Sequence, residues 1–415
     1  MKPQAKPKIF PRRDRAVALL DQSLYAGTNF ALTMLLVWLT ELEVLGYFAL
    51  IASISALLHS LYVGFILEPM TVYGSESSAR SIRIVYSHVS ALSCVSCLLL
   101  AALLYVASAD VASDYIRIAA LGCALFAGQG VVLCAKRIRV IERGVKASLL
   151  ISLRYAVAAL TVAATLAYFG IYNESSLVVT ILVASLVAAG DWLAVSLTRR
   201  CSISEFVEVV ALVKKYTSWT LVASIPATLS THGIFWIAEI ASDRTVIGQL
   251  KLCEQLLIPL GQVLKSMSLL DQIESAADYS ASNQRSVLER LRTRTWSYIR
   301  LTSMYALAVI FFVIGFGAVV DSITDGFLST FALYCVTALI AAYSVPRNVV
   351  AKACRKPEIV ASAYILMAAT IWLIGLIWRP DGVLQLVSVL IVGWIAHAIT
   401  LQLRTVQMLS VPSSS

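Results

Sequence analysis

The sequence predicts an all-α, polytopic membrane protein of about 12 transmembrane helices. Three observations support this prediction: long apolar stretches fill almost the whole chain, charged residues are scarce, and basic residues gather in alternate loops. A helix needs about 20 apolar residues to cross a hydrocarbon layer roughly 30 Å thick. Because the apolar stretches leave no room for a soluble domain, counting soluble domains from chain length does not apply here.

Composition excludes an ordinary soluble protein. Of the 415 residues, 59% are hydrophobic and 14% are charged, against roughly 25% charged residues in a soluble domain. The net charge of +9 would suit nucleic acid, but its distribution fits membrane topology, so we expect no nucleic-acid partner. The first apolar run follows a basic N-terminal segment and precedes no small-residue cleavage site, so we interpret it as a retained helix.

The apolar stretches predict twelve helices, at residues 17–40, 44–67, 82–108, 115–135, 146–170, 176–198, 213–238, 245–269, 297–320, 327–350, 358–378 and 384–408. Two connections are long, Thr198 to Lys214 and Leu270 to Trp296. The predicted organisation comprises a basic segment (1–16), a six-helix lobe (17–198), a linker (199–212), a second six-helix lobe (213–408) and a tail (409–415).

The linker has its own pattern. Ser204 could cap a short helix that has acids in its first turns, lysines in its last, and an apolar side. One interpretation is an amphipathic helix on the cytoplasmic membrane surface. The other is a simple extension of the seventh transmembrane helix.

Basic residues indicate orientation. Of the 33 lysine and arginine residues, 27 lie in the N-terminal segment, the loops after even-numbered helices and the C-terminal tail. The opposite loops hold only Arg117, Arg244 and Arg379, together with a series of acids. Since basic loops stay in the cytoplasm, both termini are predicted to be cytoplasmic. A missed helix would reverse every later loop, so the asymmetry also supports the count of twelve.

The chain repeats weakly. The first half holds Trp38-x-x-Glu41 followed by Val44-Leu45-Gly46, and the second half holds Trp236-x-x-Glu239 followed by Val246-Ile247-Gly248. Six helices per half put both halves in the same orientation. The pattern therefore favours two lobes related by a parallel repeat, which is a transporter architecture.

Several kinds of chemistry have no support in the sequence. There is no GxxxxGK[ST] phosphate loop, HExxH or GxSxG motif, and we expect neither cofactor nor metal. Each of the four histidines stands alone in an apolar run, where a hydrogen-bonded packing role is favoured. The Cys94-x-x-Cys97 pair lies inside a predicted span, so packing is again the favoured role. We therefore predict that the protein is not an enzyme.

Ionisable residues inside predicted spans are the informative ones, because they are costly in lipid and usually face a bundle interior or a water-filled cavity. Arg117, Arg154, Lys251 and Arg300 are the candidates for binding an anionic substrate, since guanidinium and ammonium groups recognise phosphate. Snorkelling to the interface is the alternative for groups near helix ends, including Arg300. Lys251 and Glu254 are also spaced to pair with each other.

Acids in the same spans are candidates for binding a coupling ion. Asp21, Glu68 and Glu254 are the three residues concerned. The alternatives are a hydrogen-bonding role for Asp21 within the N-terminal lobe and an interfacial position for Glu68. Arg154 and Lys251 come from opposite halves, so we expect them to face one central cavity.

Three stretches carry a family resemblance: Asp21-Gln22-Ser23-Leu24-Tyr25-Ala26-Gly27-Thr28-Asn29-Phe30, Gly46-Tyr47-Phe48-Ala49-Leu50 and Leu67-Glu68-Pro69-Met70. They resemble the start of bacterial polysaccharide flippases, the Wzx-type translocases of the multidrug/oligosaccharidyl-lipid/polysaccharide exporter superfamily. The stretch from Gly248 through Lys251 to Pro259 is also similar. Ser268 to Asp271 departs from the family, because many relatives have a proline there.

The resemblance implies two six-helix lobes around a central cationic cavity in the bacterial plasma membrane. It implies movement of an undecaprenyl-diphosphate-linked glycan from the inner to the outer leaflet by alternating access, for O-antigen, capsule or exopolysaccharide assembly. A polysaccharide polymerase and co-polymerase are the partners it suggests. The alternatives are a cation-coupled multidrug extruder, whose cavity should be acidic, a non-transporting scaffold, and a glycan polymerase or ligase. The short loops argue against the last two.

Overall fold

The computed structural model describes residues 12–70, 80–111, 113–199, 201–280, 284–317, 326–354 and 356–410, and no strand occurs among them. The N-terminal lobe consists of α1 (Arg12–Leu39), α2 (Leu42–Tyr62), the π-helical turn η1 (Val63–Leu67), α4 (Arg80–Val111), α5 (Asp114–Arg143), α6 (Val145–Tyr168) and α7 (Glu174–Thr198). The C-terminal lobe consists of α8 (Ile203–Thr231), α9 (Gly233–Ala241), α10 (Arg244–Ser280), α11 (Gln284–Gly317), α12 (Phe327–Ala353), α13 (Pro357–Trp378) and α14 (Val383–Ser410).

The all-α prediction is confirmed, and each predicted span coincides with one helix or with consecutive helical segments. The span at 44–67 is α2 with η1, and the span at 213–238 is α8 with α9. Among the described residues, 10 spans are long and apolar enough to cross a membrane. Two long helices, α1 and α10, fall outside that set because polar residues interrupt their apolar runs. Both helices lie at the interface between the lobes.

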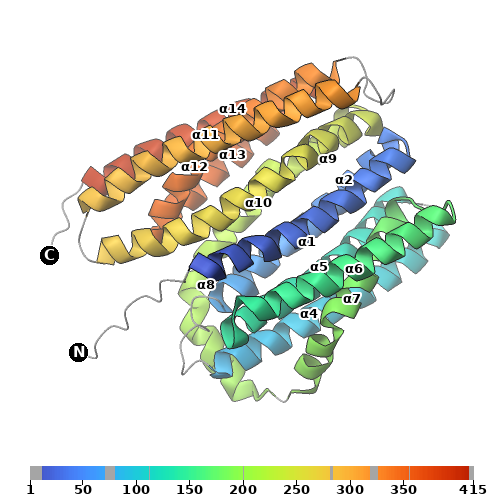
Figure 1. Ribbon diagram of the computed structural model, residues 1–415, viewed down its shortest axis with the longest axis horizontal. Helices are drawn as coiled ribbons and strands as arrows, with labels where there is room; N and C mark the ends of the chain where they lie inside the picture. The colour runs from blue at the N-terminus through green and yellow to red at the C-terminus, as the bar shows by residue number, and fades with distance from the viewer. Residues whose placement is uncertain are drawn as a thin grey trace.

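The lobes are two bundles joined along α2 and α10 (Figure 1). In the N-terminal lobe α5 packs against α2, α4 and α7, while α6 packs against α1 and α7. In the C-terminal lobe α12 and α13 both pack against α14, and α8 packs against α13. Figure 1 shows the lobes meeting at one end and diverging toward the other, where α1 begins and α14 ends.

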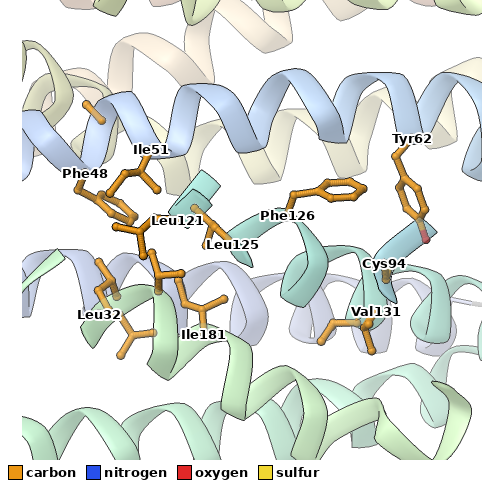
Figure 2. Close-up of a cluster of buried hydrophobic side chains, with 14 of the residues drawn as sticks. Leu32, Phe48, Ile51, Tyr62, Cys94, Leu121, Leu125, Phe126, Val131 and Ile181 are labelled. Atoms are coloured by element: carbon orange, nitrogen blue, oxygen red, sulfur yellow. The ribbon is translucent and has the colours of Figure 1, made fainter. Parts of the chain in front are cut away.

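The N-terminal core is a continuous apolar cluster between α1, α2, α5 and α7. Figure 2 shows Leu32, Phe48 and Ile51 facing Leu121 and Leu125 across this cluster. Small residues allow the helices to approach closely: a Cβ on Gly122 would lie 2.7 Å from the Cβ of Ile54. Since lipid is as apolar as these side chains, close packing of this kind is what holds helices together in a membrane.

The helices extend beyond the predicted spans at the end rich in basic residues. Most of the long predicted loop from Leu270 to Trp296 is helical, because α10 continues to Ser280 and α11 begins at Gln284. Contacts between these extensions explain the difference. Asp271 on α10 lies 3.0 Å from Arg294 and accepts a hydrogen bond of 3.0 Å from Tyr298, both on α11.

The predicted linker, residues 199–212, supplies the first turns of α8. Its N-cap is Ser202 rather than Ser204: the Ser202 hydroxyl accepts from the Glu205 amide, and the Glu205 carboxylate accepts from the Ser202 amide. This capping box stabilises the helix start. Hydrogen bonds from the Ser202 backbone and side chain lower the pKa of Glu205. Ile203 and Val207 are exposed on the same stretch.

Candidate functional site at the lobe interface

One end of the lobe interface is sealed by two glycines that hold matching positions in the predicted repeat. A Cβ on Gly46 of α2 would lie 2.0 Å from the carbonyl oxygen of Arg244, and a Cβ on Gly248 of α10 would lie 2.0 Å from that of Leu42. Leu42 and Arg244 each precede their glycine by four residues, so the contacts are reciprocal, as in a two-fold interface. We call this the closed end.

Polar side chains also join the lobes at the closed end. Arg244 of the C-terminal lobe lies 3.0 Å from Asp114 of the N-terminal lobe. The indole nitrogen of Trp236 donates a hydrogen bond of 2.7 Å to the Ser53 hydroxyl on α2. Because the closed end holds the loops poor in basic residues, the predicted topology places it outside the cell.

The opposite end, where the basic residues gather, is joined differently. The hydroxyl of Thr220 on α8 donates 2.9 Å to the carbonyl oxygen of Gly64 in η1, so the first half of α8 lies against the N-terminal lobe. The second half of α8 packs on α13 of the C-terminal lobe. Helix α8 therefore crosses between the lobes.

Below the closed end, five ionisable side chains gather at the interface: His59, His232, Lys251, Glu254 and Lys265. We call them the interface cluster. Lys251 lies 2.5 Å from Glu254 on the same helix, and the Nδ1 atom of His232 lies 3.9 Å from the same carboxylate. Lys265 stands 11 residues beyond Glu254 on α10, which at 3.6 residues per turn puts it on the same face.

The interface cluster has an excess of positive charge. It contains two lysines and one glutamate, and Lys265 interacts electrostatically with Glu254, with His232 and with His59 of the opposite lobe. Lys265 is exposed, and no carboxylate of the described residues pairs with it. The Nδ1 atom of His59 is buried without a hydrogen-bond partner in the described chain.

A buried carboxylate lies inside the N-terminal lobe, away from the interface cluster. Asp21 on α1 forms an ion pair of 3.1 Å with Lys136 on α5. It also accepts hydrogen bonds of 2.8 Å from Ser148 and 2.6 Å from Ser152, both on α6. The Lys136 ammonium lies 4.8 Å from the ring centre of Tyr25. Asp21 is thus fully surrounded by its own lobe.

The structure does not bring the four predicted substrate-binding residues together. Lys251 belongs to the interface cluster but is paired with Glu254. Arg117 lies near the closed end, 3.1 Å from Glu174. Arg300 is exposed on α11.

Arg154 does not share a cavity with Lys251, contrary to the sequence-based expectation. It is exposed on α6 among large apolar side chains. The opposite face of α6 carries small and polar residues, including Ser148, Ser152 and Ala159, and that face packs into the lobe. Close helix packing in membranes selects small residues, which turns Arg154 outward.

The coupling-ion candidates occupy three different settings. Asp21 has an ion pair and two hydroxyl donors within its lobe, Glu254 is in the interface cluster, and Glu68 directly follows η1 at the basic end. Glu68 lies 3.9 Å from Lys352 on α12 and interacts electrostatically with Arg137. Glu68 therefore lies where the N-terminal lobe contacts α12 of the C-terminal lobe.

Sequence reasoning missed three residues of these sites. Lys136 was assigned to a loop, but α5 continues to Arg143 and buries it opposite Asp21. Lys265 stands near the end of the predicted span 245–269, where snorkelling to the interface is the expected role, and the histidines, His59 among them, were expected to pack. The 11-residue spacing from Glu254 to Lys265 was the available signal for Lys265, because it predicts a shared helix face.

Comparisons with known proteins identify the fold. No family model and no curated protein matches the chain. Solved structures do match: an inward-facing multidrug resistance MATE family transporter of the MOP superfamily aligns over 95% of this chain and 96% of its own, with TM-score 0.64 and 14% identity. An outward-facing one aligns over 97% and 96%, with TM-score 0.62 and 13% identity.

A third solved structure is a MOP superfamily transporter from Pyrococcus furiosus Vc1, in which reverse polarity of the binding pocket suggests a different function. It aligns over 96% of this chain and 95% of its own, with TM-score 0.62 and 15% identity. The chain therefore has the two-lobed fold of these transporters, with six membrane helices in each lobe. The matching structures include an inward-facing and an outward-facing conformation of this fold.

Proposed function

We propose that this protein is a flippase that moves an undecaprenyl-diphosphate-linked oligosaccharide from the inner to the outer leaflet of a bacterial plasma membrane. Transport would follow alternating access, with both termini in the cytoplasm. The main observation that supports this proposal is the interface cluster, which has net positive charge and lies between the lobes below the closed end. A diphosphate is the kind of anion that such a site recognises.

The two lysines of the interface cluster differ in how readily they could bind an anion. Lys265 is exposed and forms no ion pair among the described residues, so it could contact a phosphate oxygen as a point charge. Lys251 is held by Glu254, and a diphosphate that competes for Lys251 would release the carboxylate toward His232. The glycan could occupy the region between the diverging lobes while the lipid tail stays in the bilayer.

Alternating access requires the contacts of the closed end to separate. The glycine contacts and the Arg244–Asp114 pair hold the lobes together there, and an outward-open state must break both. Export to the outer leaflet would deliver the glycan to a polymerase and co-polymerase on that side. These partners follow from the proposed substrate.

A cation-coupled multidrug extruder is the second candidate, and one observation favours it. Glu254 is a carboxylate within the cluster, only 24% exposed, and a cationic drug could displace Lys251 from it. The lysines of the cluster oppose this candidate, because they would repel the drug.

Reconstitution into liposomes separates the two candidates. The purified protein would be given a fluorescent polyprenyl-diphosphate oligosaccharide in one experiment and ethidium in another. We expect the protein to make the lipid-linked glycan accessible to an external glycosidase and to leave the ethidium distribution unchanged. Ethidium transport without glycan translocation would contradict the proposal and favour the extruder.

A further inference from the structure

The glutamate of the Trp236-x-x-Glu239 motif makes a contact at the closed end that the proposed function does not use. Glu239 lies 3.4 Å from the guanidinium of Arg244, across the turn between α9 and α10. The matching acid of the first half, Glu41, forms no ion pair in the part of the chain that the structure describes. Leu42 stands where the second half has Arg244. The two halves therefore contribute equivalent glycines but different charges to the closed end.

Arg244 is shared between the lobes. Its Nη2 atom lies 3.0 Å from a carboxylate oxygen of Asp114 in the N-terminal lobe and 3.4 Å from one of Glu239 in its own lobe. The two acids differ in exposure: the Asp114 side chain is 57% exposed and the Glu239 side chain 9%. When the lobes separate, Arg244 therefore keeps its buried partner, and water can hydrate the exposed carboxylate that it leaves.

The ring of Tyr47 on α2 is shared in the same way. Its centre lies 5.1 Å from the guanidinium carbon of Arg244 and 5.8 Å from that of Arg117. Arg117 belongs to the same lobe as Tyr47 and is held 3.1 Å from Glu174. Separation of the lobes removes one guanidinium from the ring and leaves the other. Opening of the closed end thus leaves no buried charge of this group without a partner, which is the costly outcome for an ion pair.

The distribution of charge predicts the direction in which Glu239 acts. In the C-terminal lobe Glu239 cancels the charge of Arg244, and in the N-terminal lobe Glu174 cancels that of Arg117, which leaves Asp114. Because Glu239 neutralises the cation that attracts Asp114, it weakens the attraction between the lobes. It is also a like charge to Asp114, placed beside the same guanidinium. Both effects oppose closure.

We propose that Glu239 is a positioning residue for the opening of the closed end. It holds Arg244 within the C-terminal lobe and so lowers the free energy needed to separate Arg244 from Asp114. This inference rests on the proposed alternating access and is independent of the substrate. Removal of Glu239 should tighten the closed end, whereas removal of an acid that merely braces the interface would loosen it.

The rate of opening tests the proposal in proteoliposomes that contain the full chain. The reporter is a cysteine introduced by Ser53→Cys, which reacts with a membrane-impermeant maleimide added on the side of the closed end. Ser53 is 4% exposed and bonded to Trp236 of the opposite lobe, so reaction requires the lobes to separate. Glu239→Gln should slow the reaction about threefold and Asp114→Asn should accelerate it about threefold, the scale of one exposed ion pair. The same variants without the added cysteine give the background from native thiols.

Three further variants separate this role from a general effect of charge. Asp243→Asn removes an acid next to Arg244 in sequence, whose carboxylate accepts 3.0 Å from the Val246 amide; asparagine can keep that bond, so the rate should be native. Glu239→Gln added to Asp114→Asn should have no further effect, because no acid then faces Arg244 across the interface. Arg244→Gln should open faster than Asp114→Asn, because it leaves two carboxylates facing each other. In about 1 M salt, where charges are screened beyond roughly 3 Å, the rates should converge.

The order of the rates decides the outcome. Faster or unchanged labelling in Glu239→Gln would overturn the proposal. If that variant failed to fold, Arg244→Gln and Asp114→Asn would still decide, because equal rates for those two would exclude a contribution from Glu239. A wrong order among variants that do open would overturn this inference alone. No reaction from the side of the closed end in any variant would overturn alternating access together with it.

Discussion

Two carboxylates, Asp21 buried in the N-terminal lobe and Glu254 half-buried at the lobe interface, are held in opposite ways. Asp21 in the N-terminal lobe is fixed by one ammonium and two hydroxyl groups. Glu254 in the C-terminal lobe has one close partner, Lys251, and a histidine at 3.9 Å that is not hydrogen-bonded to it. A fully satisfied buried acid is part of the framework, whereas an acid with a loosely placed neighbour can exchange partners. We therefore expect Asp21 to contribute to stability and propose that Glu254 acts in transport.

The largest expected effect is on the N-terminal pair. Lys136→Met should leave Asp21 buried and charged without its counter-ion, at a cost of about 3–5 kcal/mol. We expect a much lower thermal unfolding temperature in detergent. The double variant Asp21→Asn with Lys136→Met should recover most of that loss, because no unpaired charge remains. A single Lys136→Met variant as stable as the native protein would show that the pair is not structural.

The C-terminal acid should show the reverse pattern. Glu254→Gln keeps an oxygen that can accept from Lys251, and the Glu254 side chain is 24% exposed, so the unfolding temperature should fall less than in Lys136→Met. Translocation in liposomes should nevertheless fall by about tenfold or more, equivalent to about 1.4 kcal/mol in the transport barrier. Asp21→Asn is the matched control, which should retain transport per folded molecule. If Glu254→Gln transported normally, the contrast between the two acids would fail.

The two lobes contribute equivalent glycines, Gly46 and Gly248, to the closed end. Gly46→Ala and Gly248→Ala should loosen the closed end to a similar extent, because each added methyl group would meet a backbone carbonyl that cannot move aside alone. A cysteine at Ser53 should then react faster with a membrane-impermeant maleimide added outside. Gly27→Ala should have no such effect, since nothing lies within 4 Å of the position of its Cβ. Opening by only one of the two alanine variants would argue against a symmetric closure.

Much of the fold could be predicted from the sequence, because hydropathy determines which segments cross a membrane. The repeat of Val44-Leu45-Gly46 in Val246-Ile247-Gly248 indicated two related lobes, and these glycines meet at the closed end. Helix ends were less predictable. The run from Lys136 to Arg143 is polar enough for a loop, yet α5 continues through it because Asp21 supplies a partner for Lys136.

The site was only partly predictable, because depth in a span does not determine the direction of a side chain. Arg154 and Lys251 are both deep, but Arg154 lies on the exposed face of α6 and Lys251 is buried. The small residues Ser148, Ser152 and Ala159 indicate the packed face of α6, and Arg154 is not on it. The pairing of Lys251 with Glu254, one of the two alternatives that the spacing allowed, is present. The approach of His59 to Lys265 joins different lobes and could not be inferred from spacing.

The most direct test of the account is the effect of charge at Lys265 on translocation of the lipid-linked glycan in liposomes. Lys265 is exposed, so Lys265→Arg, Lys265→Ala and Lys265→Glu should all fold. Transport should decrease in that order, with Lys265→Glu inactive, because a carboxylate there would repel the diphosphate. Equal transport by the alanine and glutamate variants at native abundance would contradict the central claim that the interface cluster recognises an anionic substrate.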